Sequence, residues 1–251
     1  MKKGVLIFIP LMIFWIIWLT WRALAPANSL KKLEQFALNS SDTAYDSIYS
    51  HPDLIEITRE AQFKRSLLAL KKDSLHLIID LKDSMVGLYI NGVIIHSIKP
   101  DTYYLDPVLS NLSNRAYMNL FGPIMSISAD TASIVKEPVV VRQAPKDTIE
   151  AALNAYKPDT LMQNPAFWLI QLPGEIDLVF SQATDKTQLD TEVRDQFNEF
   201  IRSRYHGESL SGFLQLSKAT SPVQILVSLP VDDLRAIYRA LPENGKLVLR
   251  Y

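Results

Sequence analysis

The feature that most constrains this 251-residue chain is an apolar run from Gly4 to Trp21 that contains no charged side chain. As an α-helix, about 18 residues extend about 27 Å, which is close to the thickness of about 30 Å of a bilayer's hydrocarbon core. A helix that is apolar on every side needs lipid or a very large protein core around it. We therefore expect a transmembrane helix here, with the rest of the chain as a folded body held at a membrane.

The residues around this run bear on its orientation. Lys2 and Lys3 precede it, and Arg22, Lys31 and Lys32 follow it, so the positive charge on the two sides is close to balanced. Three tryptophans gather toward its C-terminal end, where an aromatic belt would anchor a helix at the membrane surface: Trp15, Trp18 and Trp21. We favour an N-terminus on the inside and a body on the outside.

A cleaved secretory signal is the alternative to an anchor. Two small-x-small triplets, Ala23–Ala25 and Ala25–Ala27, follow the apolar run. The apolar region of a signal peptide is about 7 to 15 residues long, which is shorter than this run. Pro26 also stands directly after the first triplet, where a signal peptidase accepts it poorly. An uncleaved anchor is the preferred interpretation, and the cleaved signal stays open.

The composition excludes several functions for the body, which has about 225 residues, enough for one large domain or two small ones. The net charge is −1 and no long basic stripe occurs, so nucleic-acid binding has no electrostatic support. The absence of cysteine excludes disulfides, thiolate metal sites and a cysteine nucleophile. The histidines have no metal-ligand spacing: His51, His76, His96 and His206. We expect no metal and no cofactor.

Hydrophobic periodicity predicts an α+β fold in three parts: a transmembrane anchor with its flanks (residues 1–28), a helical stalk (29–73) and a β-rich domain (74–251). The longest stalk helix is expected from Asp53 to Lys72. Its apolar positions are expected to pack on the following domain: Leu54, Ile57, Ala61, Leu67, Leu68 and Leu70. Its charged positions are expected to face outward: Glu56, Arg59, Glu60, Lys64 and Arg65. A partner-binding helix is the alternative.

The β-rich domain is expected to begin with a hairpin at Asn91-Gly92, because both residues of such a turn need a positive φ. The segment from Lys99 to Pro123 is expected to be an irregular connection whose aromatic residues either plug a groove or stack on a sugar ring. Further strands are expected at 124–134, 137–142, 167–172, 176–182, 223–229 and 246–250, and helices at 43–50, 147–156, 187–205 and 232–241.

Two stretches at the edges of this domain resemble the ends of a bacterial L,D-transpeptidase catalytic domain. The opening stretch is Leu77–Leu81 followed by Gly87–Ile94, which reads Gly-Leu-Tyr-Ile-Asn-Gly-Val-Ile. The closing stretch is Leu229–Tyr238, followed by Gly245 and Leu247–Leu249. The resemblance implies a mixed sheet or barrel with peripheral helices. It also implies a single-pass protein of the bacterial inner membrane, with its C-terminal domain in the periplasm.

The family's active site lies directly before the closing helix, in a Ser-x-Gly-Cys-aliphatic-Arg run. In this chain the cysteine position holds Leu226, the preceding glycine Ile225 and the arginine Ser228. His206-Gly207 stands at about the distance of an earlier His-Gly pair of the family. Acyl transfer in the family needs an activated thiolate, and a leucine cannot attack a carbonyl. The resemblance therefore implies an inactive site that keeps His206, Gly207 and Ser228 as ligand-binding candidates.

The sequence leaves three functions open. The first is a membrane-anchored envelope protein with an inactive transpeptidase-like domain that binds peptidoglycan or a partner protein. The second is a cell-wall hydrolase or transferase that uses a carboxylate pair, or a serine near His206: Ser217, Ser221 or Ser228. The third is a subunit of a membrane complex, with the anchor helix or the helix at 54–70 as its interface.

Overall fold

The computed structural model describes residues 2–39, 51–72, 75–127, 129–134, 136, 166–183, 195, 199 and 221–251, and for residues 2–11 and 52 the backbone alone. Its helices are α1 (Lys2–Ala23), α2 (Ala25–Asn39), α4 (Pro52–Leu70), α5 (Pro107–Ser110), α6 (Asn114–Phe121) and α9 (Val231–Ala240). The helices expected at 43–50 and 147–156, the strand expected at 137–142 and nearly all of the helix expected at 187–205 lie outside the described residues.

The described strands form two five-stranded mixed sheets, which confirms the α+β class. Sheet A has the order β3-β2-β1-β10-β5 and sheet B the order β4-β9-β8-β7-β6. The strands of sheet A are β1 (His76–Asp80), β2 (Met85–Ile90), β3 (Val93–Ile98), β5 (Met125–Ser126) and β10 (Lys246–Arg250). Those of sheet B are β4 (Thr102–Leu105), β6 (Asp130–Ala132), β7 (Phe167–Leu172), β8 (Ile176–Gln182) and β9 (Val223–Leu229).

One hydrophobic core joins the two sheets. Leu77 and Leu247 of sheet A belong to the same buried cluster as Trp168, Phe180 and Ile225 of sheet B. The chain crosses from β9 in sheet B through α9 to β10 in sheet A, where β10 pairs in parallel with β1. The two stretches at the edges of the domain are therefore adjacent strands of one sheet.

The predicted hairpin is confirmed, since β2 and β3 are antiparallel and Asn91 and Gly92 have φ of 51° and 77°. Two predictions nearby were wrong. The segment at 99–123 is not irregular but contains β4, α5 and α6. The single strand expected at 124–134 is two short strands, β5 and β6, which lie in different sheets. Helices and strands as short as these span too few residues to give a clear periodic signal, which explains both errors.

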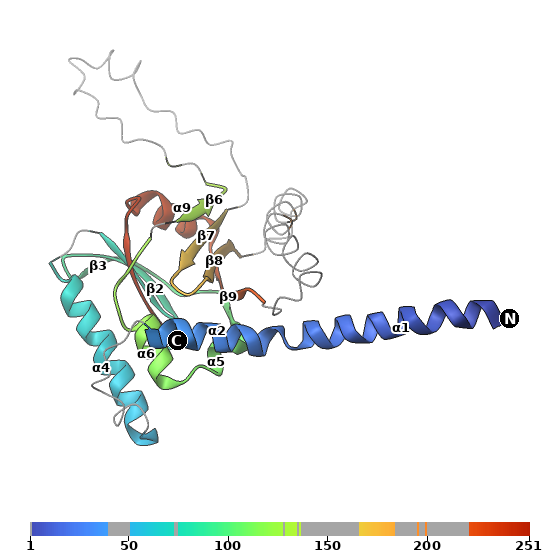
Figure 1. The fold of residues 1–251 in the computed structure, drawn as a ribbon. Helices are drawn as coiled ribbons and strands as arrows, with labels where there is room; N and C mark the ends of the chain where they lie inside the picture. Colours follow the sequence, from blue (N-terminus) through green and yellow to red (C-terminus); the bar gives the residue numbers. More distant parts are fainter. Residues whose placement is uncertain are drawn as a thin grey trace, which may run out of the picture.

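Helix α2 packs firmly on the body, and α1 extends from it as a nearly continuous helix (Figure 1). The Ser29 hydroxyl donates to the Ser221 carbonyl at 2.8 Å, and Lys32 pairs with Glu175 at 2.6 Å. Gly174 has a φ of 81°, and a Cβ there would lie 2.6 Å from Cδ1 of Leu33, so the β7–β8 turn accepts α2 only without a side chain. Within the described residues, no helix combines the length and the apolarity needed to cross a membrane.

Helix α4 packs on sheet A with a face that only partly matches the predicted one: Leu70 is buried and Leu67 packs against the same cluster, as expected. Its buried residues are Phe63, Ser66 and Leu70, whereas Leu54, Ile57 and Leu68, which were expected to be buried, are exposed. Ser66 donates a hydrogen bond to the Gly122 carbonyl at 2.7 Å, and Gln62 donates to the same oxygen at 3.1 Å. The helix is therefore held both by these hydrogen bonds and by Phe63 and Leu70, which form a buried cluster with Ile78 and Val248 of sheet A.

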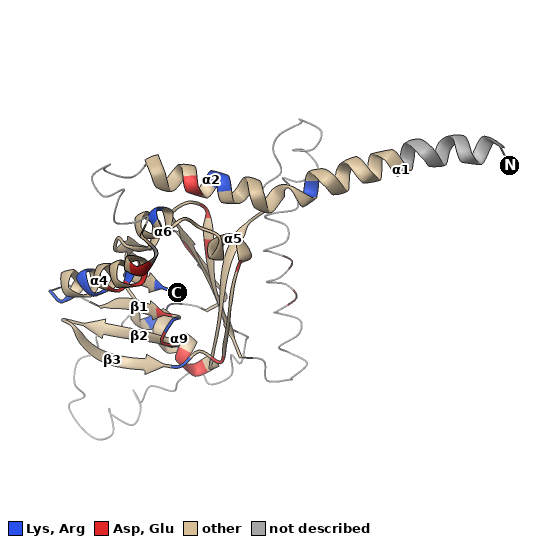
Figure 2. Cartoon of the chain, turned by 90° about the horizontal axis from the view of Figure 1, so that it is seen from below, with Lys and Arg blue, Asp and Glu red and all other residues tan. Residues whose placement is uncertain are grey.

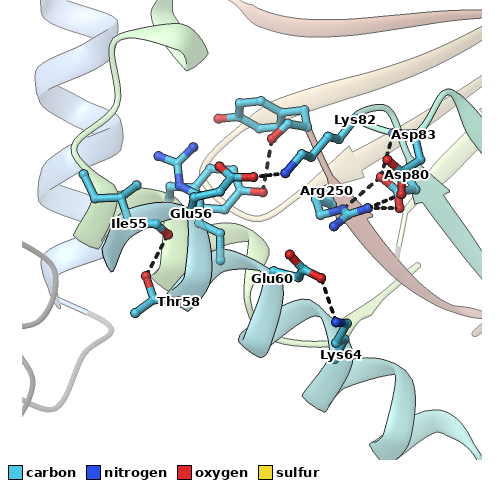
Figure 3. Close-up of polar contacts among 12 residues, drawn as sticks. Ile55, Glu56, Thr58, Glu60, Lys64, Asp80, Lys82, Asp83 and Arg250 are labelled. Atoms are coloured by element: carbon cyan, nitrogen blue, oxygen red, sulfur yellow. Dashed lines mark hydrogen bonds and ion pairs between the residues drawn. The ribbon is translucent and has the colours of Figure 1, made fainter. Parts of the chain in front are cut away.

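A charged cluster at the end of sheet A holds α4 in this position (Figure 3). Arg250 forms a bidentate ion pair with Asp80 and a second pair with Asp83 at 2.7 Å, and its guanidinium lies 4.4 Å from the Phe63 ring centroid. Burial disfavours the cation, but the two carboxylates outweigh it and raise the pKa of Arg250. Arg59, expected to face outward, stacks on the Tyr117 ring at 3.9 Å.

Candidate functional site

Strand β9 places the candidate residues on the face of sheet B that points away from the core. Its residues alternate between buried and half-buried from Val223 to Leu229. Ile225, at the family's glycine position, is buried in the core between the sheets. Leu226 and Ser228 have the opposite parity, so they share the outer face, as the period of two in a strand requires.

Leu226 lies in a row of side chains whose exposure increases toward the β4 edge of sheet B. It is paired with Val179 of β8 on one side and with Tyr104 of β4 on the other. Val179 and its neighbour Leu169 on β7 are buried, Leu226 is half-buried, and Tyr104 is 50% exposed. Leu226, which the resemblance places at the cysteine position, therefore lies beside an accessible aromatic ring that can stack on a ligand.

The next row of this face carries hydroxyl groups. Ser228 is paired with Thr102 of β4 and with Ser181 of β8. These groups can donate and accept hydrogen bonds, but none is activated as a nucleophile by a described histidine, because no described histidine lies on a strand of sheet B. The strands that carry this face therefore offer hydroxyl groups but, within the described residues, no histidine to activate them.

Asp177 of β8 is a buried carboxylate that the sequence analysis did not identify. It lies on the same outer face as Val179, two residues along the strand, and is paired with Gln171 and Gln224. A buried carboxylate is rare in proteins unless polar partners compensate it. A single acidic residue inside a strand gave no recognisable motif.

The other candidates are dispersed. His206, Gly207 and Ser217 lie outside the described residues. The Ser221 main chain exchanges hydrogen bonds with the Ser29 hydroxyl, so Ser221 joins β9 to α2. Of the three candidate serines, Ser228 is therefore the one that the structure places on this face.

Two histidines belong to sheet A rather than to this site. His76 is buried and stacks on Tyr89 with centroids 6.0 Å apart. His96 Nε2 lies 2.8 Å from Oδ1 of Asp233, which joins β3 to α9. The two residues of this pair are 137 positions apart, so no sequence spacing could have indicated it. Among the described residues, no cluster of His, Asp or Glu could hold a metal ion.

The expected membrane-anchor residues lie on α1. The rings of Trp15 and Trp18 meet edge to face with centroids 5.7 Å apart, and the Arg22 guanidinium lies 5.4 Å from the Trp18 ring centroid. Trp21 is half-buried. The rings of Trp15 and Trp18 and the Arg22 guanidinium thus lie together near the C-terminal end of the helix.

Comparison with known proteins gives no match: no protein-family model, no curated protein and no solved structure matches the chain. The class of protein is therefore defined by its fold alone, an α+β body of two mixed five-stranded sheets.

Proposed function

We propose that the chain is a membrane-anchored envelope protein whose body is a catalytically inactive relative of the L,D-transpeptidases. In this proposal the body binds peptidoglycan or a partner protein through the outer face around Leu226. The observation that carries it is the half-buried leucine at the nucleophile position, beside the open ring of Tyr104. A hydrocarbon side chain there supports binding without turnover.

The topology supports the transpeptidase-like assignment. The opening and closing stretches that carry the resemblance become β1, the β2–β3 hairpin, α9 and β10. They meet in space, because β10 lies against β1 in parallel register, with Ile78 opposite Val248. Two stretches from opposite ends of the domain's sequence thus form one continuous part of sheet A and its flanking helix α9.

The N-terminal segment supports the anchor. The uncharged run from Gly4 to Trp21 lies within α1, which extends away from the body (Figure 1). Apolar side chains on all sides of its described part are exposed: Met12, Ile13, Phe14, Ile16, Ile17 and Leu19. Such a surface is stable in lipid and costly in water.

The test is retention of the full chain, in detergent, on purified cell-wall sacculi. We expect Tyr104→Ala to reduce retention about tenfold, because stacking on a sugar ring or peptide would be lost. Tyr103→Ala is the matched control: Tyr103 is 46% exposed on the same strand but is paired with Val227, so it has the opposite parity. No retention, or equal loss in both variants, contradicts binding at this face.

The enzyme alternative is tested in the same experiment. Release of soluble cell-wall fragments that resists thiol alkylation and disappears in Ser228→Ala would favour a serine hydrolase. The complex-subunit alternative has its own observation, since α4 exposes Ile57 at 63% and Leu68 at 70%. Single exposed apolar residues are ordinary, but a continuous stripe marks an interaction site.

A further inference from the structure

Helix α4 carries an apolar stripe on its solvent side, which we call the outer stripe: Leu54, Ile57, Ala61 and Leu68. These positions are separated by three, four and seven residues, so they line one face of the helix, on which the exposed Arg65 stands between Ala61 and Leu68. The opposite face, with Phe63 and Ser66, is the buried one. The exposed face thus carries three large apolar side chains, whereas the buried face includes the polar Ser66. An exposed apolar face of this kind is typical of a surface that has a partner.

The charges beside the outer stripe are arranged in two halves. Asp53 and Glu60 lie in the N-terminal half, and Lys64 and Lys71 follow toward the C-terminus. Steps of seven, four and seven residues place all four on the same flank of the stripe. Figure 2 shows acidic and basic residues along this helix. One flank of α4 is thus acidic at one end and basic at the other.

We propose that the outer stripe binds the outer stripe of a second copy of this chain, with the two α4 helices antiparallel across a two-fold axis at Ala61. An antiparallel pair places position 61 − n opposite position 61 + n. Leu54 then lies against Leu68 of the partner subunit. The small Ala61 at the axis allows the two helices to approach to about 8 Å.

Charge complementarity selects this arrangement. In an antiparallel pair the same flank of each helix meets, so Glu60 lies near Lys64 of the partner subunit and Asp53 near Lys71 of the partner subunit, and each contact occurs twice. In a parallel pair, whose two-fold axis runs along the helices, this flank would meet the opposite flank of the partner helix, so these four charges would not face one another. Both subunits contribute the same surface to this contact, the outer stripe, as an isologous two-fold interface requires.

The structure leaves these groups accessible. The pair Lys64–Glu60 within the helix is 2.7 Å long, and the two side chains are 67% and 43% exposed, respectively. Lys82 from the β1–β2 turn pairs with Glu56, which lies outside the proposed contact (Figure 3). A single helix pair is a small interface, below about 1,200 Å² in total, so we expect a dissociation constant on the order of 10 μM.

Sedimentation equilibrium of the full chain in density-matched detergent tests the dimer. We expect a monomer–dimer equilibrium that Leu68→Glu weakens at least tenfold, because its carboxylate would be buried against Leu54 of the partner subunit. Val93→Glu is the matched control, since Val93 on β3 is 63% exposed, close to the 70% of Leu68, but lies off the stripe. A chain that stays monomeric at 100 μM or more, or equal loss in both variants, overturns the proposal.

Charge variants test the antiparallel orientation. Glu60→Lys and Lys64→Glu should each dimerise about tenfold more weakly, since each places like charges together at both contacts. A mixture of the two variants should form heterodimers with wild-type affinity, because lysines of one copy then face glutamates of the other. Heterodimers no tighter than the two homodimers overturn the antiparallel register.

The absence of cysteine from the chain permits a direct geometric test. Ala61→Cys places one thiol at the two-fold axis, where Cα atoms of two close helices fall within disulfide range, about 4.4–6.8 Å. We expect oxidation to yield a covalent dimer in this variant but not in Val93→Cys. Equal cross-linking in both variants overturns the axis at Ala61.

Discussion

At the scale of the residue, Tyr251 forms an aromatic cluster with Tyr117 and Phe121, whose ring centroids lie 5.0 and 5.1 Å from its own. Its hydroxyl donates to the Leu109 carbonyl at 3.1 Å. Burial raises the pKa of both Tyr251 and Tyr117. The unfolded tyrosine loses its proton near pH 10 while the folded one keeps it. Stability is therefore fully present below about pH 10 and is lost as the pH rises through the folded pKa.

Tyr251→Phe tests this linkage. At pH 8 we expect the variant to be about 1 kcal/mol less stable, because the Leu109 carbonyl loses its donor. Between pH 8 and 11 the variant should lose less stability than the parent, since one group with a raised pKa is gone. Urea unfolding at the two pH values measures both effects. Tyr103→Phe, at an exposed position, should change neither, and equal losses in Tyr251→Phe and the parent contradict the argument.

At the scale of the element, the orientation of α4 has a direct thermodynamic test. Phe63 lies under the Arg250 guanidinium and is buried, so Phe63→Ala should cost about 3 kcal/mol of unfolding free energy. Ile57 is on the outer stripe, so Ile57→Ala should change the stability of the monomer by no more than about 0.5 kcal/mol. Urea unfolding at low protein concentration measures both. Similar costs would mean that the helix is rotated as its hydrophobic pattern predicts.

The elements differ in how far the sequence predicts them. The β2–β3 hairpin follows from Asn91-Gly92 alone, because the turn chemistry is local. The buried face of α4 depends on the Gly122 carbonyl and on Arg250, which contact it from distant positions. No periodicity within α4 contains that information.

The candidate site likewise has some features that follow from the sequence of one strand and others that depend on how the strands pair. The period of two in β9 places Leu226 and Ser228 on one face, as the sequence allows one to predict. The openness of that face depends on β4, whose strand was interpreted as an irregular connection. Asp177 joins the face only because β8 pairs with β9 in the register that sets Val179 against Leu226 and Asp177 against Gln224. Pairing partners are a property of the fold and could not be deduced from one strand.

At the scale of the whole molecule, α1 and α4 lie at opposite ends (Figure 1). A two-fold axis across the middle of α4 turns the partner subunit end for end, so the two α1 helices leave the proposed dimer in opposite directions. Two copies that are anchored by α1 in one flat bilayer can form this pair only if the chain bends between α1 and the body.

The junction of α1 and α2 is the place for such a bend. Helix α1 ends at Ala23 and α2 begins at Ala25, with Pro26 in its first turn. Pro26 has no N–H, so it cannot bond the Arg22 carbonyl four residues earlier. The helix is therefore weakest where α1 meets the docked α2.

Pro26→Ala should stiffen this junction, because it restores the missing hydrogen bond. In detergent, where the two α1 helices are independent, we expect the variant to dimerise like the parent. In nanodiscs that hold two copies, the Ala61→Cys cross-link should form in the parent background and fall at least fivefold with Pro26→Ala, since straight α1 helices cannot share a bilayer in this pair. An equal cross-link in nanodiscs with and without Pro26 would mean that the α4 pair forms without a bend at this junction. The antiparallel arrangement would then have to be replaced by one in which both α1 helices leave the dimer in the same direction.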